Sequence, residues 1–568
     1  YKPVKGLSLR AVGGANILDG QKKEWRRAYG KYGVEGLIST AFGQKSPNSV
    51  TQNNSHRQYL TGQLIAEYKG VFGKHDINVL GGWSAEENLY EDLQGKRTDI
   101  IGNELPALNL GDTDGWSNGA DENEWALVSG FMRMNYAFAS KYLVEANFRA
   151  DASSRFSKKH RWGVFPSASV GWRITEEKFM KNQRIFDNLK LRVSWGQLGN
   201  QNGLGMYDHI ASYNIKGYYP FKSELGQWAV ISKLPSETRT WETVEMNNFA
   251  VDMAFLRNRL TVTGEYFIKR NKDMLVNVEV PSVIGVDVPT GNYGELEVKG
   301  WEVTVGWQDR IKDFSYSARF NLSDQKDKLV DYGVEYNGFV AGVNQKVQGY
   351  SLGSIFGYRT DGYFTSEEEV KNSAAYNKSI TGVGDIKYVD KDGDGKISAP
   401  NDLEYLGTTT PRYTFGLNLT AAWKGFDLGI LFQGVGKRNF YLSSEVMNPY
   451  YATWNNFSYK MHNDYWTPEN PNAAFPRYYA GANHNYQISD HWLQNAAYVR
   501  LKNLQLGYTI DPKLTKSWGI QRLRVYFSGD NLCEYSKLND NFDPELSNVD
   551  GYVYPIMRNF SFGLNVTF

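Results

Sequence analysis

Three aspartates at alternate positions are the sharpest candidate for a metal site in this sequence. Asp390, Asp392 and Asp394 begin the segment DKDGDGKISAPND (390–402), and Gly395 follows them. EF-hand-like loops bind calcium through hard oxygen ligands at this spacing, and a glycine permits their sharp turn. The segment therefore predicts a structural calcium ion that stiffens a long loop, or else an acidic turn that binds nothing.

The second half of this segment departs from the EF-hand pattern. The carbonyl of Lys396 and the side chain of Ser398 fit as oxygen ligands, but the twelfth position is Asn401 in place of glutamate. Asp402 comes one residue late, and a bulge at 399–400 would let it close the site. The candidate ligands are therefore Asp390, Asp392, Asp394, Lys396 and Asp402. Such an ion would be non-catalytic, and no other cofactor is required.

Two long segments, 199–240 and 437–496, are rich in aromatic residues. Flat rings offer apolar faces to sugar C–H groups, and tyrosine adds a hydroxyl donor. Aromatic residues serve equally well as anchors of a protein interface or as the cores of folded loops, so these three interpretations stay open. The candidates for substrate or partner contact are Tyr218, Tyr219, Trp228, Tyr450, Tyr451, Trp454, Tyr465 and Trp466.

Residues suited to catalysis are scattered along the chain. No H-E-x-x-H motif occurs, and Cys533 is the single cysteine. Carboxylates are plentiful, so composition alone leaves a glycosidase pair open, although acidic residues on a wet sheet face need no catalytic role. We therefore expect that the protein is not an enzyme. A net charge of +1 gives no reason to expect a nucleic-acid partner.

The elements that must hold these residues are indicated by a two-residue period. In the last residues, RNFSFGLNVTF, Phe560, Phe562 and Leu564 alternate with polar residues such as Asn559 and Ser561. Such alternation predicts a β-strand with two unlike faces. No run of 18 apolar residues occurs, so the sequence predicts no transmembrane helix.

About sixteen segments share this alternation and have the length that a tilted strand needs to cross a bilayer. One of them changes phase near Asn503, which predicts a β-bulge. The segments are 6–17, 57–70, 75–88, 125–138, 141–155, 162–175, 188–198, 241–256, 259–273, 297–308, 314–325, 411–422, 426–436, 497–510, 522–533 and 557–568.

The connections between these segments alternate between short and long. Short connections such as 140–141 and 424–425 take turns with long ones such as 326–410 and 437–496. A transmembrane antiparallel β-barrel has this organisation, with short periplasmic turns and long extracellular loops. Its apolar face meets lipid and its polar face lines a wet lumen. An interfacial aromatic girdle would then include Trp195, Trp301, Trp307 and Trp423, although ordinary packing explains these residues too.

Several long motifs resemble the SusC/RagA-type TonB-dependent outer-membrane transporters of Bacteroidota. The resemblance covers nearly the whole chain in order. The motifs that carry it are GWRITEEKFMKNQRIFDNLKLRVSWGQLGNQN (171–202), TRTWETVEMNNFAVDMAFLRNRLTVTGEYFIKRNKDML (238–275), VKGWEVTVGW (298–307), DKDGDGKISAPNDLEYLGTTTPRYTFGLNLTAAWKGFDLGILFQG (390–434) and the terminal Phe568. The resemblance implies a barrel of roughly 22 strands with a plugged lumen.

Residues 1–568 would then form the C-terminal part of such a barrel. We expect a plug domain, a TonB box and the first strands to lie upstream of Tyr1. The last strand should pair with 522–533 and close the barrel against an upstream strand. The terminal Phe568 resembles the C-terminal signal by which outer-membrane barrels are recognised for insertion.

The resemblance also implies partners and a function. It implies a location in the outer membrane, contact with TonB and with membrane lipid, and a SusD-like surface lipoprotein that acts as a lid. It also allows a dimer of transporter–lipoprotein pairs. The first hypothesis is active import of glycan fragments, that is oligosaccharides. The alternatives are import of oligopeptides by the same machinery, and a surface adhesin or scaffold barrel that transports nothing.

Overall fold

The computed structural model describes most of the chain. The described residues are 1–28, 31–33, 36–39, 47–102, 104–221, 224–231, 233–277, 281–333, 339–442, 444–450, 459–546, 554 and 556–568.

Sixteen strands form one large sheet, in which sequence neighbours pair throughout. Where the register is given, the pairing is antiparallel. In sheet order the strands are β1 (Leu7–Arg26), β4 (Ser49–Phe72), β5 (His75–Thr98), β6 (Trp116–Phe138), β7 (Tyr142–Ser153), β8 (Trp162–Arg173), β9 (Phe186–Asn200), β12 (Glu242–Phe255), β13 (Leu260–Val276), β14 (Gly291–Ile311), β15 (Phe314–Asp331), β21 (Arg412–Trp423), β22 (Phe426–Lys437), β25 (Tyr498–Thr509), β26 (Arg522–Ser536) and β27 (Asn559–Thr567).

These strands confirm the predicted all-β fold class and the sixteen predicted segments, one strand to each. The alternation of short and long connections is also confirmed. Several strands are longer than predicted: β5 continues to Thr98, where the prediction ended at 88. The added residues mix apolar and polar types on each face, with Leu89, Glu91 and Leu93 on one and Tyr90 and Asp92 on the other, so they carry no clean alternation that a sequence pattern could reveal.

Smaller elements lie in the connections between these strands. The short strands are β2 (Lys31–Gly33), β3 (Gly36–Ser39), β10 (Asn214–Phe221), β11 (Glu224–Val230), β16 (Gly342–Gln345), β17 (Ser354–Tyr358), β18 (Thr360–Tyr363), β19 (Ile386–Tyr388), β20 (Leu403–Thr408), β23 (Asn439–Tyr441) and β24 (Leu493–Asn495). The α-helices are α1 (Glu367–Asn372), α2 (Ser444–Met447) and α3 (Pro512–Thr515). The 3-10 helices are η1 (Leu108–Leu110), η2 (Ile174–Glu176), η3 (Lys178–Met180), η4 (Ser282–Ile284), η5 (Lys460–Asn463), η6 (His484–Tyr486), η7 (Asp490–Trp492) and η8 (Lys516–Trp518).

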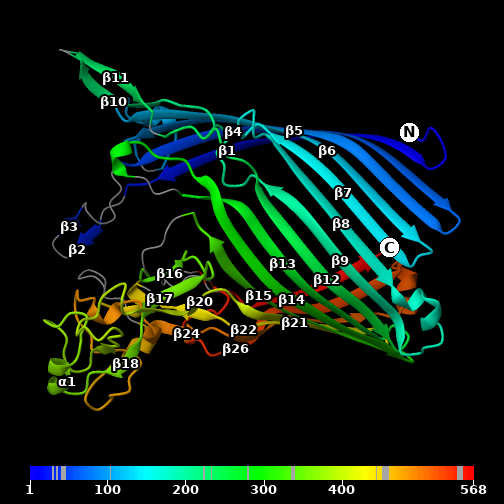
Figure 1. Ribbon diagram of the computed structural model, residues 1–568. Helices are drawn as coiled ribbons and strands as arrows, with labels where there is room; N and C mark the ends of the chain where they lie inside the picture. The colour runs from blue at the N-terminus through cyan, green and yellow to red at the C-terminus, as the bar shows by residue number, and fades with distance from the viewer. Residues whose placement is uncertain are drawn as a thin grey trace. The chain divides into compact units, whose positions relative to one another are not determined.

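The chain divides into two compact units. Unit 1 contains Tyr1–Ser169, Gly196–Thr243 and Asn277–Asn292, and unit 2 contains Val170–Trp195, Val244–Val276 and Tyr293–Phe568. In unit 2, the loop elements β16, β17, β18, β20 and α1 gather at one end of strands β15, β21 and β22 (Figure 1). Within the described part of the chain, no helix is both long and apolar enough to cross a membrane.

Cross-strand register gives the sheet of unit 2 two unlike faces. Leu419 of β21 lies opposite Ile430 of β22, which lies opposite Leu504 of β25. The adjacent row, on the other face, runs through Thr420 and Gln505. Directly paired residues share a face, so the apolar alternation of each strand is in phase with that of its neighbour.

The last strand continues both faces. β27 pairs with β26, as predicted, and this register places Phe562 opposite Phe527 and Leu564 opposite Val525. On the other face Asn565 lies opposite Arg524. The apolar side chains of β27 are largely exposed. The strand therefore has the two faces that its sequence predicts.

A continuous aromatic row marks the short-turn end of the sheet in unit 2. Phe314 lies opposite Trp423, Trp423 opposite Phe426, and Phe426 opposite Tyr508. The rings of Phe426 and Tyr508 have centroids 4.6 Å apart. Trp423 thus lies at a strand end, as predicted. The predicted position of Trp301 is wrong, because β14 begins at Gly291 and places Trp301 in the middle of the strand.

Unit 1 has a corresponding aromatic row at its own short turns. Phe72 lies opposite His75, His75 opposite Phe138, and Phe138 opposite Tyr142. The His75 and Phe138 ring centroids are 5.0 Å apart. Phenylalanine and tyrosine therefore form most of these aromatic rows, whereas the sequence analysis predicted an aromatic girdle from tryptophan alone.

The predicted bulge lies at Lys502. Between β22 and β25 the register passes from Leu501 to Asn503 and omits Lys502, and the neighbouring pairing with β26 shifts at the same place. On β26, Asn531 has a φ of 53°, in the left-handed region, which allows the extra residue of that strand to be accommodated. The phase change in the sequence is therefore confirmed.

Candidate functional site

The long connections of unit 2 fold into a domain with its own hydrophobic core. Its buried members come from the β15–β21, β22–β25 and β26–β27 connections. They include Tyr358, Ile386, Tyr388, Ile397, Leu403, Phe440, Leu442, Val446, Met447, Phe475, Trp492, Ala496 and Leu538. We call this group the loop core. It shows that many of the aromatic residues in 437–496 pack within the loops, which was one of the three open interpretations.

A buried carboxylate fixes the centre of this loop domain. Asp385 is 0% exposed and accepts hydrogen bonds from Tyr479 Oη at 2.9 Å and Asn485 Nδ2 at 2.9 Å. His484 Nε2 lies 3.0 Å from the same carboxylate, and the backbone N–H of Gly382 donates at 2.7 Å. These bonds join two connections that are about 100 residues apart in the sequence. These hydrogen bonds compensate for the unfavourable desolvation free energy of a carboxylate in an apolar core.

The three alternating aspartates come together as predicted. One carboxylate oxygen from each of Asp390, Asp392 and Asp394 lies within 4.8 Å of the others. Asp390 accepts the backbone N–H groups of Gly393 and Gly395, both at 2.8 Å. These two glycines have positive φ, which turns the chain around the carboxylates. The geometry suits a small hard cation at a partly exposed loop.

Asp402 lies outside this group of three. It is 1% exposed, and its two oxygens accept the backbone N–H groups of Lys391 and Ser398, each at 2.7 Å. Asn401 instead donates to Asp392 at 2.8 Å. Asp402 therefore holds the base of the loop against the loop core, while the three aspartates lie at its exposed edge. The backbone N–H of Lys396 donates to Asp394 at 2.8 Å.

The predicted aromatic residues of the 437–496 segment have different environments. Tyr450 and Tyr465 are both partly exposed, and both contact the ring of Tyr478, with ring centroids 5.7 and 5.4 Å from its own. Trp466 packs over Gly384, where an added Cβ would lie 2.3 Å from the indole ring. Trp466 therefore contributes to loop packing. Tyr451 and Trp454 lie outside the described residues.

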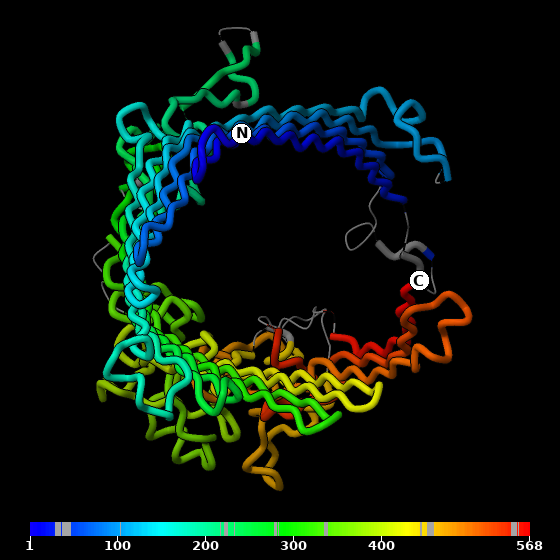
Figure 2. The backbone as a smooth tube through the Cα atoms, turned by 90° about the vertical axis from the view of Figure 1, so that its right-hand side faces the viewer, coloured from blue at the N-terminus to red at the C-terminus, as the bar shows by residue number. Residues whose placement is uncertain are grey.

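The predicted aromatic residues of the 199–240 segment lie on a projecting hairpin. Strands β10 and β11 pair only with each other, and the hairpin stands away from the other strands of unit 1 (Figure 1 and Figure 2). Tyr218, Tyr219 and Trp228 are all exposed, and the rings of Tyr219 and Trp228 are in edge contact at 6.3 Å. The hairpin thus offers aromatic surface that the described part of the chain leaves uncovered.

The polar face of the unit 2 sheet carries ion pairs that the sequence did not predict. Arg192 of β9 reaches Asp252 of β12 at 2.7 Å and Glu265 of β13 at 2.8 Å. Arg524 of β26 pairs with Asp427 of β22 across the intervening strand β25, at 2.5 Å. The paired residues are 60 to 97 positions apart in the sequence. Because they are so far apart, a sequence pattern could not predict these ion pairs.

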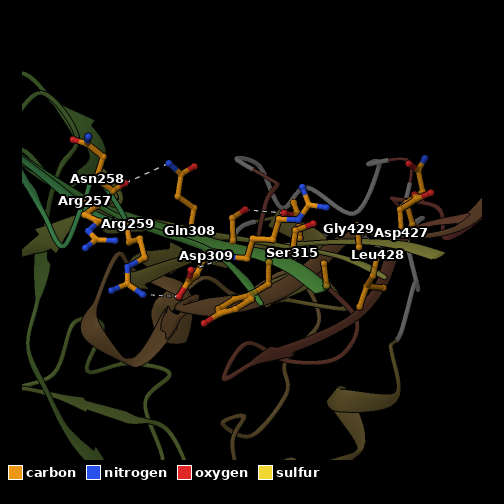
Figure 3. A pocket seen from close by; sticks show the side chains of 16 residues that line it. Arg257, Asn258, Arg259, Gln308, Asp309, Ser315, Asp427, Leu428 and Gly429 are labelled. Carbon is orange, nitrogen blue, oxygen red and sulfur yellow. Dashed lines mark hydrogen bonds and ion pairs between the residues drawn. The ribbon is translucent and has the colours of Figure 1, made fainter. Parts of the chain in front are cut away.

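A hollow of about 710 Å³ lies at the short-turn end of unit 2 (Figure 3). Its lining includes Arg259, which forms an ion pair with Asp309 at 3.0 Å. It also includes Ser317, whose hydroxyl forms a hydrogen bond with that of Thr420 at 2.7 Å. Asp427 also contributes to the lining. The hollow therefore presents hydroxyl, amide and charged groups, as the wall of a wet passage would.

A family model described as "TonB dependent receptor-like, beta-barrel" matches residues 10–532 of this chain. The chain belongs to the TonB-dependent receptor-like β-barrel family. The membership confirms the recognised resemblance and the predicted outer-membrane location. It also supports the expectation that the chain is not an enzyme, since the family is one of transporters.

Relatives in the TonB-dependent receptor family match most of the chain. TonB-dependent receptor P26 of Formosa agariphila is 30% identical over 530 residues, which cover 88% of this chain and 52% of that protein. TonB-dependent receptor SusC of Bacteroides thetaiotaomicron is 28% identical over 545 residues, which cover 91% of this chain and 50% of SusC. The chain spans about half the length of the curated relatives that it matches.

Solved structures of this receptor type share the fold. The structure of the RagAB peptide transporter matches with a TM-score of 0.83 and 23% identity, over all of this chain and 60% of that one. At this identity the likeness supports the fold alone. The cargo of the present chain must be argued from its own residues.

Proposed function

We propose that this chain forms the barrel-wall part of a transporter that imports oligosaccharides across the outer membrane, energised through TonB. The observation that carries the proposal is the family match over residues 10–532, on a sheet with one apolar and one polar face. The apolar face suits lipid and the polar face suits a wet lumen. Active import fits a solute that is too large or too scarce for a passive pore.

The charges of the polar face favour an uncharged cargo. Arg192, Arg412 and Arg524 are each paired with a carboxylate of the same sheet, so the charges of these three arginines are neutralised within the sheet. An oligosaccharide needs hydrogen-bond partners and apolar ring faces, which the polar face and the loop tyrosines supply. An oligopeptide carries charged termini, for which free cations and carboxylates would be better partners. Import of oligopeptides is therefore the second candidate.

Tyr450 and Tyr465 are the best placed of the aromatic residues for contact with substrate. Both are partly exposed on the loop domain, and each ring packs against that of Tyr478, which restricts its movement. Rigid, exposed rings bind a sugar face at little cost in conformational entropy. Trp466 packs against Gly384 and would support this surface from within the loops.

The β10–β11 hairpin is the best candidate for contact with a SusD-like lipoprotein lid. Tyr218, Tyr219 and Trp228 are exposed on a two-stranded hairpin, and such hairpins are marginally stable in water when nothing packs against them. Tyrosine and tryptophan are also the residues that most often anchor protein interfaces. A lid that covers the hairpin would stabilise it and bury its rings.

The proposed calcium ion would have a structural role. Asp390, Asp392 and Asp394 would hold it at the exposed edge of the loop, and Ile397 and Leu403 anchor the same segment in the loop core. Bound calcium would neutralise three neighbouring carboxylates and fix the chain around Gly393 and Gly395. It would thereby stiffen the β15–β21 connection.

Uptake by cells tests the proposed function. Cells that express the full-length transporter with its lipoprotein should accumulate a labelled oligosaccharide, and a protonophore or loss of TonB should abolish this accumulation. Calorimetry on the purified complex, with oligosaccharides and peptides as ligands, separates the two cargo classes. Tight peptide binding without oligosaccharide binding would reverse the choice of cargo. Ligand binding without energised uptake would favour a non-transporting surface barrel.

A further inference from the structure

Two of the short-side connections in unit 2 are longer than a hairpin turn and expose apolar side chains. The β25–β26 connection contains α3 and η8, where Leu514 is 66% exposed and Trp518 is 69% exposed. The β8–β9 connection contains η2 and η3, where Phe179 is 69% exposed and Ile185 is 67% exposed. Turns such as 312–313 and 424–425 reverse the chain with two residues and need no such groups.

Cationic side chains accompany the exposed apolar ones in both connections. Lys513 and Lys516 flank Leu514, and both lysines are exposed. Within the described part of the chain, neither lysine forms an ion pair. Lys178 and Lys181 lie beside Phe179 in the same way. The combination of apolar side chains and lysines therefore occurs twice, as KFMK (178–181) and KLTK (513–516).

The local structure fixes the outward direction of these groups in the β25–β26 connection. Thr515 is 0% exposed, and its hydroxyl donates to the carbonyl of Ile520 at 3.0 Å. Asp511 caps α3 by accepting the backbone N–H of Lys513 at 2.9 Å. Leu514 in α3 and Trp518 at the end of η8 are both exposed, whereas Thr515 between them is buried. Thr515 thus anchors the connection, and the apolar pair and the lysines are left exposed.

The β25–β26 connection begins next to the aromatic row of unit 2. Tyr508, the last member of the aromatic row in unit 2, lies just before the connection on β25. Aromatic rows of this kind mark the boundary between the hydrocarbon and the headgroups. A segment next to that boundary meets phosphate groups, which are complementary in charge to unpaired lysines.

We propose that the β25–β26 connection is a binding site for anionic phospholipid of the periplasmic leaflet. Lys513 and Lys516 pair with the phosphate of the headgroup, and Leu514 and Trp518 insert beside the upper parts of the acyl chains. The β8–β9 connection, through Phe179 and its lysines, is a second site of the same kind. This proposal depends on the outer-membrane location and is independent of the transported cargo.

Native mass spectrometry of the full-length transporter tests the headgroup part of the proposal. The protein is released from nanodiscs that contain phosphatidylglycerol and phosphatidylethanolamine. Wild-type protein should retain phosphatidylglycerol preferentially, and K513Q/K516Q should lower that preference by about fivefold per lysine. The matched control K158Q/K159Q, in the β7–β8 connection at the opposite strand ends, should leave it unchanged. An unchanged preference in K513Q/K516Q would overturn the proposal.

Spin-label accessibility tests insertion independently of lipid preference. A nitroxide is attached to Trp518→Cys in a Cys533→Ser background, and the protein is placed in nanodiscs without any partner. Membrane insertion makes the label more accessible to oxygen than to a water-soluble nickel complex. A label at Lys158→Cys should show the reverse. If the label at position 518 is as accessible to nickel as the control, the segment lies in water, where a periplasmic protein would be its partner, and the lipid proposal is wrong.

Discussion

The ammonium group of Lys502 lies 2.8 and 3.0 Å from the two carboxylate oxygens of Glu545. Lys502 is the residue that the β-bulge leaves out of the pairing between β22 and β25. Arg500, two residues earlier, is 3% exposed and pairs with Asp543 at 2.7 Å and with Glu545 at 2.8 Å. The bulge thus places two cations where they hold the β26–β27 connection.

Loss of the Lys502 charge should loosen the β26–β27 connection. We expect Lys502→Gln to destabilise the local structure around Glu545 by about 1 kcal/mol, because both side chains are largely shielded from water. Hydrogen exchange of the backbone at 539–546 measures the change. Lys537→Gln, which removes an exposed charge from the same connection, should leave exchange unchanged. Equal protection in wild type and Lys502→Gln would contradict this role.

Removal of the buried carboxylate should unfold part of the loop domain. Asp385→Ala leaves Tyr479, His484 and Asn485 without their shared acceptor, and we expect a loss of about 3 kcal/mol in loop stability. Limited proteolysis within 377–385 and 477–485 reports the loss. The control Asp361→Ala removes an exposed carboxylate paired with Lys387 and should have little effect. Similar cleavage of both variants would show that Asp385 is dispensable.

The loop domain should become less stable in mild acid. Burial lowers the pKa of His462, although the hydrogen bond from its Nε2 to the carbonyl of Val446 opposes this effect. The neutral ring also accepts the backbone N–H of Tyr459 through Nδ1 at 3.0 Å, which a protonated ring could not do. The unfolded state therefore binds the proton more readily than the folded state. Stability should be complete above the unfolded pKa of about 6.5 and should fall as the pH drops below it.

His462→Gln tests this pH dependence, because glutamine can accept and donate at the same positions without titrating. Hydrogen exchange of the loop domain between pH 7 and pH 5 should change less in the variant than in the wild type. Burial also lowers the pKa of His491, so some dependence on pH should remain. Identical pH profiles would exclude His462 as the main titrating group.

A side chain at position 384 should displace Trp466. Gly384 has a φ of 90°, and an added Cβ would lie 2.3 Å from the indole ring. We expect Gly384→Ala to cost more than the ~1 kcal/mol of a strained backbone alone. Gly393→Ala is the matched control, because Gly393 also has positive φ but open space around its Cα. Thermal unfolding compares the two, and an equal effect would show that contact with Trp466 is unimportant.

The calcium prediction has a direct measurement. Calorimetry with calcium should detect one binding event in the wild type that Asp392→Asn with Asp394→Asn removes. Asp390→Asn is less suitable, since Asp390 also holds the backbone of Gly393 and Gly395. Asp361→Asn, an exposed carboxylate outside the group, should bind calcium as the wild type does. No heat of binding in the wild type would show that the loop is an acidic turn.

The sequence by itself determined the strands, their faces and a bulge near Asn503, which the structure places at Lys502. These features depend on alternation between neighbouring residues, which is local and therefore visible in one chain. It also brought Asp390, Asp392 and Asp394 into one candidate group, because a short loop gives such residues little freedom to separate. Strand ends such as that of β5 were missed where each face mixes apolar and polar residues.

Only the tertiary structure decided which groups meet across the chain. Asp385 and Asn485 lie 100 positions apart, and Arg524 and Asp427 lie 97 apart. At such separations the sequence does not predict that either pair is in contact. The same holds for Trp466, which the sequence offered as a binding residue and which the fold packs against Gly384. The role of an aromatic or charged side chain depends on what covers it, and that is set by contacts between distant segments.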